Sequence, residues 1–276
     1  MNYELRETKK LQYHGIIHNH SASSQEGCYS LSVLHRRWAH RFDFAAMTEH
    51  AERTSAEAYA LYVQECDALS DDRFRFIPGL EVATESGDML LLGCRKYICT
   101  RDPFQVLEEA SECLILLAHP EDGLIIPAVL ERAHGFEGWN MRHMGGYMPP
   151  LDWLVNWRQE LRPGQIMTGG NDIHKVDPRR KIVTVVRSHS GSETDILEAI
   201  KQGQFITSNG IFSVTANGHV LYRGRKVMPT LSTLIVHCYR ASRRGVKACL
   251  HLGGVILGFC GVDKQGRIRL RRLISQ

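Results

Sequence analysis

Short apolar runs alternate with segments of helical periodicity along most of the chain. Leu31, Leu34 and Trp38 recur at three- and four-residue intervals, which is typical of a helix with one buried face. The stretch 55–70 is rich in Ala, Glu and Leu, and Ser55 stands where a helix N-cap is expected. Further helices are predicted within 102–112, 127–135 and 193–203, and strands within 13–20, 42–50, 74–84, 88–94, 113–120, 135–140 and 165–174.

Repeated strand–helix units with apolar strands predict an α/β fold on a mostly parallel sheet, either closed as a barrel or open. Polar residues stand where these apolar runs end. In parallel α/β folds the carboxyl ends of the strands meet at one rim, which is where active sites lie. We therefore expect one shared site from His18, His20, His50, Glu81, His119, Asp172 and His174.

The pattern changes between Ser208 and Ile211. Beyond this point, alternating or apolar runs separated by Gly-containing turns replace the helical period. Twelve of the 34 Lys and Arg residues lie in 213–276 beside one acid, Asp263, which leaves 22 basic and 29 acidic residues before them. We predict a main domain over 1–210 and a small basic, antiparallel β module over 211–276, suited to a negatively charged partner.

Composition narrows the class of protein. A chain of 276 residues, 43% of them hydrophobic, can bury the core of one large domain. Its apolar runs are strand-sized, far below the roughly 20 residues that cross a bilayer, and its polar first ten residues do not resemble a secretory signal. The eight cysteines are scattered without a CxxC pair. We expect a cytoplasmic protein with reduced thiols and no membrane contact.

His18 and His20 end the first predicted strand, with one residue between them. Side chains alternate along a strand, so both rings point to the same side. Two imidazoles with carboxylates from neighbouring strand ends suit Zn, Mn or Fe. By itself such a pair favours chance or a packed histidine over a metal site, and its companions along the chain decide its meaning.

Those companions resemble the polymerase-and-histidinol-phosphatase (PHP) family of metal-dependent phosphoesterases. The matching motifs, in the family's order, are HNHS (18–21), FDFAAMTEH (42–50), GLEVAT (79–84), LLAHP (116–120), FEGWN (136–140) and GGNDIH (169–174). Residues 181–210 are similar to the closing strand and helix of the family's small phosphoesterase branch. The resemblance reaches about Asn209 and implies a distorted (β/α)7-type barrel with two or three divalent metal ions, Mn, Fe or Zn.

The resemblance also implies metal ligands. One ion would be held by His18, His20, Glu81 and Asp172, a second would be shared by Glu81 and His119, and a further position would belong to His50 and His174. Glu26 stands one residue beyond the place of a family Asp that completes the metal shell. A solvated loop carboxylate is the alternative reading of Glu26.

Other positions are expected around these ligands. Glu49 replaces the Asp of the family's TDH ending, and we expect Glu49 and Asn140 to orient the ligands from behind, the alternative for Glu49 being a surface acid. Phosphate contacts are expected from Arg142, His143 and Arg179, because arginine binds phosphate through two parallel hydrogen bonds. Catalytic roles are expected for His50, His174 and Asp172.

These features predict hydrolysis of a small phosphorylated substrate, a nucleotide or another phosphate ester. Close metal ions would bind phosphate oxygens and activate water. An alternative is a nuclease that binds nucleic acid through the basic module over 211–276. A non-catalytic scaffold stabilised by metal is a third possibility, and the departures at Glu26 and Glu49 are its motivation.

Overall fold

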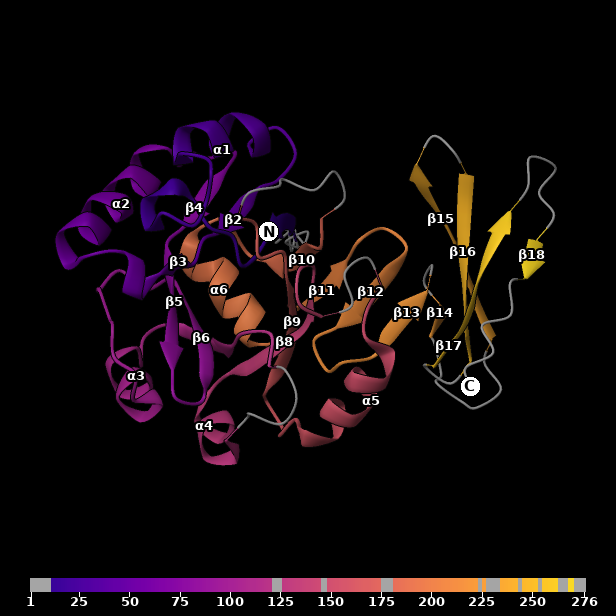
Figure 1. Ribbon diagram of the computed structural model, residues 1–276. Helices are drawn as coiled ribbons and strands as arrows, with labels where there is room; N and C mark the ends of the chain where they lie inside the picture. The colour runs from indigo at the N-terminus through magenta and orange to yellow at the C-terminus, as the bar shows by residue number, and fades with distance from the viewer. Residues whose placement is uncertain are drawn as a thin grey trace, which may run out of the picture.

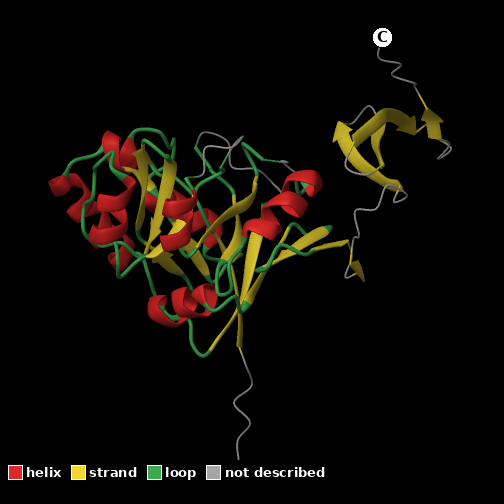
Figure 2. Ribbon diagram, turned by 90° about the horizontal axis from the view of Figure 1, so that it is seen from below, coloured by secondary structure: helices red, strands yellow, loops and turns green. Residues whose placement is uncertain are grey.

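The computed structural model describes residues 11–120, 126–144, 148–174 and 181–222, together with the backbone of short strands after them. Its helices are α1 (Leu31–Trp38), α2 (Ala56–Ala68), α3 (Pro103–Glu109), α4 (Pro127–Arg132), α5 (Leu151–Glu160) and α6 (Glu193–Lys201), with 3-10 turns η1 (Ala22–Ser24) and η2 (Ala51–Arg53). Figure 2 shows these helices flanking the strands on several sides. None of the described helices is long and apolar enough to span a bilayer.

The helix ends follow local capping chemistry. The Ser55 hydroxyl accepts a hydrogen bond from the Ala58 N–H at 3.2 Å and starts α2 where the sequence predicted it. Asp102 caps α3 in the same way, and Pro103 occupies its first turn. Gly203, with φ 71°, follows the end of α6, where the left-handed conformation costs glycine little.

The strands of the main body form two sheets. In order along the eight-stranded sheet they are β14 (Arg225–Lys226), β13 (Val220–Tyr222), β12 (Phe212–Thr215), β11 (Phe205–Ser208), β10 (Val183–Ser188), β1 (Leu11–Ile16), β2 (Phe44–Ala46) and β4 (Arg75–Ile77). In the six-stranded sheet they are β3 (Glu49–His50), β5 (Gly79–Thr84), β6 (Gly87–Leu92), β7 (Leu114–Leu117), β8 (Gly135–Asn140) and β9 (Ile166–Gly170).

Parallel pairing and hairpins are mixed in both sheets. β1, β2 and β4 are parallel neighbours, as are β3 with β5 and β7, β8 and β9. β5 and β6 are antiparallel because only Glu85 and Ser86 connect them, too short for a crossover. The α/β class predicted from the sequence is confirmed, and hairpins accompany the parallel strands.

The two sheets face one another across a shared apolar core. Its members come from both sheets and from α6, for example Phe44, Ile77, Leu90, Leu116 and Ile196. Figure 1 shows α6 lying between the strands of the two sheets. A larger apolar cluster lies on the other side of the strands, beneath α1 to α5. The side chains at the strand ends are therefore carried by a framework buried on both faces.

The eight-stranded sheet continues past residue 210. β12 pairs with β11, and Phe212 and Val214 are buried in the larger apolar cluster. A separate antiparallel sheet is formed by β15 (Leu234–Ser242), β16 (Gly245–Leu252), β17 (Val255–Val262) and β18 (Ile268–Leu270), and these strands pair with no strand of the other two sheets within the described residues. The pairing after 211 is antiparallel, as predicted, but β12 to β14 extend the main sheet.

Candidate metal centre

The polar residues at the strand ends meet at one rim. The backbone after β1 runs beside the backbone after β9: the Asp172 N–H donates to the His18 carbonyl at 2.7 Å, and the His20 N–H donates to the Ile173 carbonyl at 3.0 Å. The Thr48 N–H donates to the Asn19 carbonyl at 2.9 Å and brings the start of β3 to the same place. Segments far apart in sequence are thus fixed together by backbone hydrogen bonds.

Three of the converging residues have left-handed backbones. His18 has φ 59°, Asp172 has φ 51° and His119 has φ 23°. Such conformations cost non-glycine residues of order 1–3 kcal/mol each and are concentrated at functional sites. Each lies just after a strand, so the turn redirects its side chain toward the centre of the rim.

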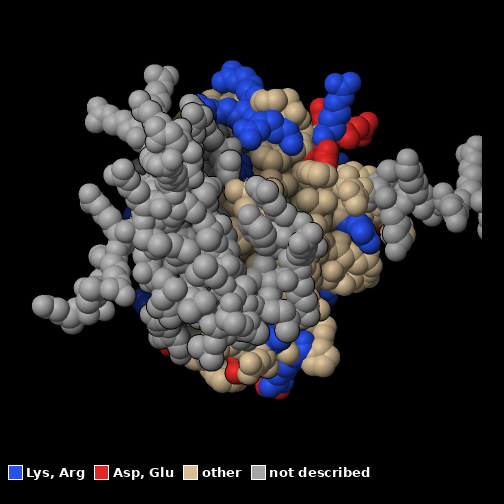
Figure 3. All heavy atoms as spheres, turned by 90° about the vertical axis from the view of Figure 1, so that its right-hand side faces the viewer, with Lys and Arg blue, Asp and Glu red and all other residues tan. Residues whose placement is uncertain are grey.

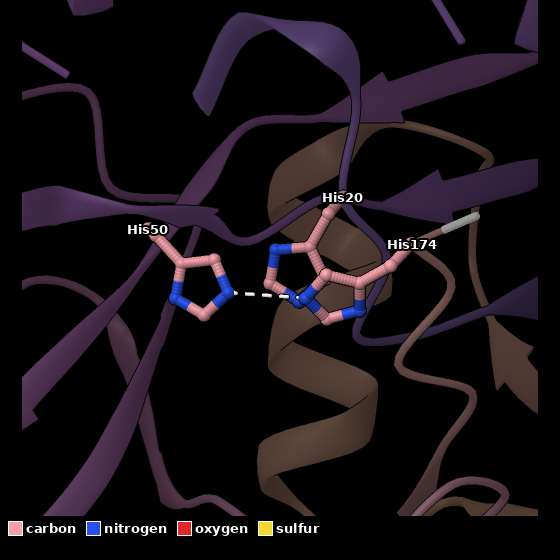
Figure 4. A group of neighbouring side chains, drawn as sticks. All are labelled: His20, His50 and His174. Atoms are coloured by element: carbon pink, nitrogen blue, oxygen red, sulfur yellow. Dashed lines mark hydrogen bonds between the residues drawn. The ribbon is translucent and has the colours of Figure 1, made fainter. Parts of the chain in front are cut away.

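Ligand atoms form four overlapping groups, within each of which they all lie within 4.8 Å of one another. The groups are His18, His20 and Asp172; His18, Glu81 and His119; His20, His50 and His174; and His119, His143 and Asp172. Figure 4 shows His50 and His174 pointing toward one another beside His20, with their Nε2 atoms 3.2 Å apart. The structure thus brings together the predicted ligands except Glu26, and adds His143.

Glu81 lies at the middle of these groups. Its Oε2 is 3.2 Å from Nε2 of both His18 and His20 and 3.5 Å from Nδ1 of His50. Its Oε1 is 3.1 Å from Nε2 of His119. A single buried carboxylate therefore contacts four imidazoles, the arrangement expected of a ligand shared between cations.

Asp172 is the second shared carboxylate. Its oxygens are 3.0 Å from His143 and from His174 and 3.3 Å from His20. Despite these short distances, both oxygens of Asp172 and both ring nitrogens of His20 are buried without a well-oriented hydrogen bond. Burying polar atoms without hydrogen-bond partners costs free energy of folding. These oxygens and nitrogens point at one another without hydrogen bonds, an arrangement that fits a cation bound between them.

The imidazoles and carboxylates of the cluster shift one another's pKa values against the effect of burial. Burial by itself would raise the pKa of Glu81 and of Asp172, but His18 and the other imidazoles outweigh burial and hold both pKa values well below the ordinary range. Burial would lower the pKa of His18, yet the carboxylates of Glu137, Glu81 and Asp172 raise it. Anionic carboxylates are the form in which these acids bind metal.

His50 behaves differently. Burial and the neighbouring imidazoles of His20 and His174 lower its pKa to about 4, against the opposing effect of Glu81. Its ring is therefore neutral near pH 7. A neutral imidazole is suited to bind a cation and unsuited to donate a proton.

A turn after β8 covers the outer side of the centre. Arg142 Nη1 donates to His174 Nδ1 at 2.8 Å and lies 3.7 Å from Asp172, while 54% of its side chain stays exposed. The His143 ring stacks on His119 with 4.2 Å between centroids. The guanidinium and the His143 ring thus stand between the buried part of the cluster and solvent.

Two predicted carboxylates take other places. Glu49 is buried, and its carboxylate accepts hydrogen bonds from the Ser21 N–H, the Ser24 N–H and the Ser24 hydroxyl, so its direct contacts are with the loop after His20 rather than with an imidazole. Burial raises its pKa. Glu26 pairs with Arg53 at 3.2 Å and lies outside the four groups. The predicted phosphate contact Arg179 lies outside the described residues.

Glu137 is a residue that the sequence analysis did not single out. It is fully buried, and its Oε1 accepts a hydrogen bond from His18 Nδ1 at 2.9 Å. In the sequence Glu137 is one polar position within the short apolar strand FEGWN. This strand is one of the motifs that resemble the PHP family, and that resemblance was the signal that could have identified Glu137. Asn140, predicted behind the ligands, donates to Glu137 Oε2 at 3.0 Å.

Comparison with known proteins shows a shared fold. No protein-family model matches the chain, and no curated protein sequence matches it. Among solved structures, the chain is similar to a two-domain protein containing a predicted PHP-like metal-dependent phosphoesterase from Bacteroides vulgatus ATCC 8482, with a TM-score of 0.58 and 16% sequence identity. The similarity covers 88% of this chain and 76% of the other.

Proposed function

We propose that this chain is a PHP-family phosphoesterase that uses two or three divalent metal ions, Mn, Fe or Zn, to hydrolyse a small phosphate ester such as a nucleotide. The observation that carries the proposal is the set of four overlapping ligand groups, together with the short contacts of Glu81 and Asp172 to the imidazoles of these groups. The motif order in the sequence and the fold shared with the Bacteroides protein support it.

The donor set fits such cations. It combines imidazoles with two anionic carboxylates, and both oxygens of Asp172 and both ring nitrogens of His20 are buried without hydrogen-bond partners. When bound, the cations would supply Lewis acidity toward phosphoryl oxygens and a lower pKa for water. His18, His20, His50, Glu81, His119, Asp172 and His174 would hold them.

The outer residues handle the substrate. Arg142 and His143 face solvent above the ligands, so we assign them to the phosphoryl group, with the Arg142 guanidinium donating to its oxygens. The Asp172 carboxylate contacts the rings of both His143 and His174, with N···O distances of 3.0 Å each. His50 is neutral near pH 7, which suits it to hold a cation and not to donate a proton to the leaving group.

The proposed fold is the distorted barrel of that family. The shared core between the sheets and the hydrogen bonds that join the strand ends of β1 and β9 support closure. The alternative is a nuclease that acts through the basic C-terminal region, whose side chains lie outside the described residues. On the described part of the face seen in Figure 3, basic side chains stand in separate groups among uncharged and acidic residues.

The test uses purified full-length protein. Hydrolysis of p-nitrophenyl phosphate and of a nucleotide panel is measured with added Mn²⁺, and bound Mn, Fe and Zn are measured by elemental analysis. We expect wild-type activity, and its loss when His18 and His20 are both replaced by Ala. Glu131→Gln, at an exposed ion pair with Arg162, is the control. Full activity in the double variant, or protein that binds no metal, would refute the proposal.

A further inference from the structure

The geometry points to a positioning unit of Glu137 and Asn140, which couples the metal ligands to the turn that presents Arg142 and His143. Its role rests on the proposed function, because the ligands it positions are those of the proposed metal centre. The unit begins at β8, whose last residue is Asn140, and both side chains are fully buried.

Both carboxylate oxygens of Glu137 accept hydrogen bonds from residues of the proposed metal centre. Oε1 accepts from His18 Nδ1 at 2.9 Å, and Oε2 accepts from the backbone N–H of His119 at 3.1 Å. A carboxylate at Nδ1 keeps the proton there and leaves Nε2 of His18 facing Glu81 and Asp172. The second hydrogen bond supports His119 at its left-handed backbone. One side chain therefore orients two predicted ligands from different strand ends.

Gly170 makes room for this carboxylate. A Cβ at Gly170 would lie 1.8 Å from Glu137 Oε1 and 2.8 Å from the His18 Cβ. No side chain fits at that point of β9. The second glycine of the GGNDIH motif is therefore required by the contact between Glu137 and His18, and not by its own backbone angles.

Asn140 continues the unit outward. Its Nδ2 donates to Glu137 Oε2 at 3.0 Å, and its Oδ1 accepts from the backbone N–H groups of Arg142 and His143 at 2.8 and 3.0 Å. Backbone hydrogen bonds between Asn140 and Met144 close the turn. The amide of Asn140 thus connects the support of His18 and His119 to the two residues that face the substrate.

The test separates positioning from simple structural support. Mn²⁺ affinity is measured by titration calorimetry, and KM and kcat for p-nitrophenyl phosphate are measured separately, after circular dichroism shows that each variant is folded. For Glu137→Gln we expect the Mn²⁺ affinity to fall about 10- to 100-fold, the size typical of losing a partner behind a ligand. For Asn140→Ala we expect mainly a higher KM, since the turn loses its anchor.

Asn140→Asp keeps the acceptor for the turn and removes the donor to Glu137. It should lower Mn²⁺ affinity with a smaller rise in KM than Asn140→Ala, and it tests the link even when Glu137→Gln does not fold. Glu131→Gln is the matched control and should leave both quantities unchanged. Effects of Glu137→Gln and Asn140→Asp on affinity should be less than additive when combined.

Wild-type Mn²⁺ affinity in folded Glu137→Gln, or full additivity in the double variant, would overturn this inference. Wild-type protein that binds Mn²⁺ but hydrolyses no phosphate ester would instead overturn the proposed reaction, while the affinities still decide the positioning role. The two failures are therefore distinguishable.

Discussion

The inner and outer halves of the centre differ in exposure. The inner half comprises His18, His20, Glu81 and Asp172, whose side chains are 0–2% exposed. The outer half comprises His50, His119, Arg142 and His143, whose side chains are 13–54% exposed. Burial strengthens the electrostatic interactions of the inner half. Under the proposed function the inner half would hold cations only, whereas the outer half would combine the ligands His50 and His119 with Arg142 and His143, which would meet the substrate.

The largest effect is expected from Glu81→Gln in the inner half. The carboxylate contacts four imidazoles, and the amide would remove its charge and place an N–H₂ toward nitrogens that must face a cation. We expect Mn²⁺ affinity and kcat/KM to fall by more than about 100-fold, because partners behind a ligand already cost 10- to 100-fold. Calorimetry and steady-state kinetics check this. Near wild-type Mn²⁺ binding would show that Glu81 is no shared ligand.

Arg142→Ala probes the outer half. Loss of a charged hydrogen bond of about 1.5–3 kcal/mol to a phosphoryl oxygen predicts a fall in kcat/KM of roughly 10- to 100-fold. Mn²⁺ affinity should stay at the wild-type level, since the guanidinium is no metal ligand. Arg53→Ala, another exposed arginine, is the control and should change neither quantity. A parallel loss of Mn²⁺ affinity in Arg142→Ala would erase the distinction between the two halves.

The inner half also predicts how the metal-free protein responds to pH. The raised pKa of His18 gives stability that is full below its unfolded pKa of about 6.5 and is lost as pH rises through the folded pKa. The lowered pKa of Glu81 gives stability that is present above about 4.3 and is lost as pH falls through the folded pKa. The contributions of His18 and Glu81 are therefore both complete only between about pH 4.3 and 6.5, and the contribution of His18 is lost toward alkaline pH.

Urea unfolding in the presence of EDTA, repeated from pH 4 to 9, measures this directly. The midpoint should fall toward alkaline pH without metal, and added Mn²⁺ should reverse the trend, since metal binds deprotonated imidazoles. His50 acts in the opposite sense to His18: its pKa is lowered from 6.5 to about 4, so its neutral ring contributes stability that is lost as pH falls from about 6.5 through 4. A midpoint that rises steadily from pH 6 to 9 in EDTA would contradict the interpretation of the inner half.

The sequence marked the residues that converge at the rim better than the residues that support them. His18, His20 and Glu81 stand where apolar runs end in the sequence, so a local pattern marks them, and the rule that strand ends meet at one rim predicted that they lie together. Glu137 carries no such mark, because its partner His18 lies 119 residues away and only the tertiary fold pairs them. The roles of Glu49 likewise depend on the conformation of the loop after His20.

The fold likewise divides into features that the sequence predicted and features that it did not. Alternation of apolar and polar residues predicted strands after residue 211 but could not say which strand each would join. Phe212 and Val214 fill the core beneath the main sheet, so β12 pairs with β11 and the eight-stranded sheet runs past the predicted boundary at 210. Strand propensity is local, whereas the choice of partner depends on which apolar surface remains to be covered.

The smallest effect is expected from Glu26→Gln. Its carboxylate pairs with the exposed Arg53, and exposed ion pairs are worth about 0–1 kcal/mol. Mn²⁺ affinity, kcat/KM and the free energy of unfolding should all remain close to wild type, and Arg53→Ala should behave alike because it breaks the same pair. The resemblance to the PHP family instead implies a ligand at this position. A tenfold loss of Mn²⁺ affinity in Glu26→Gln but not in Arg53→Ala would show that the loop moves Glu26 inward when metal binds.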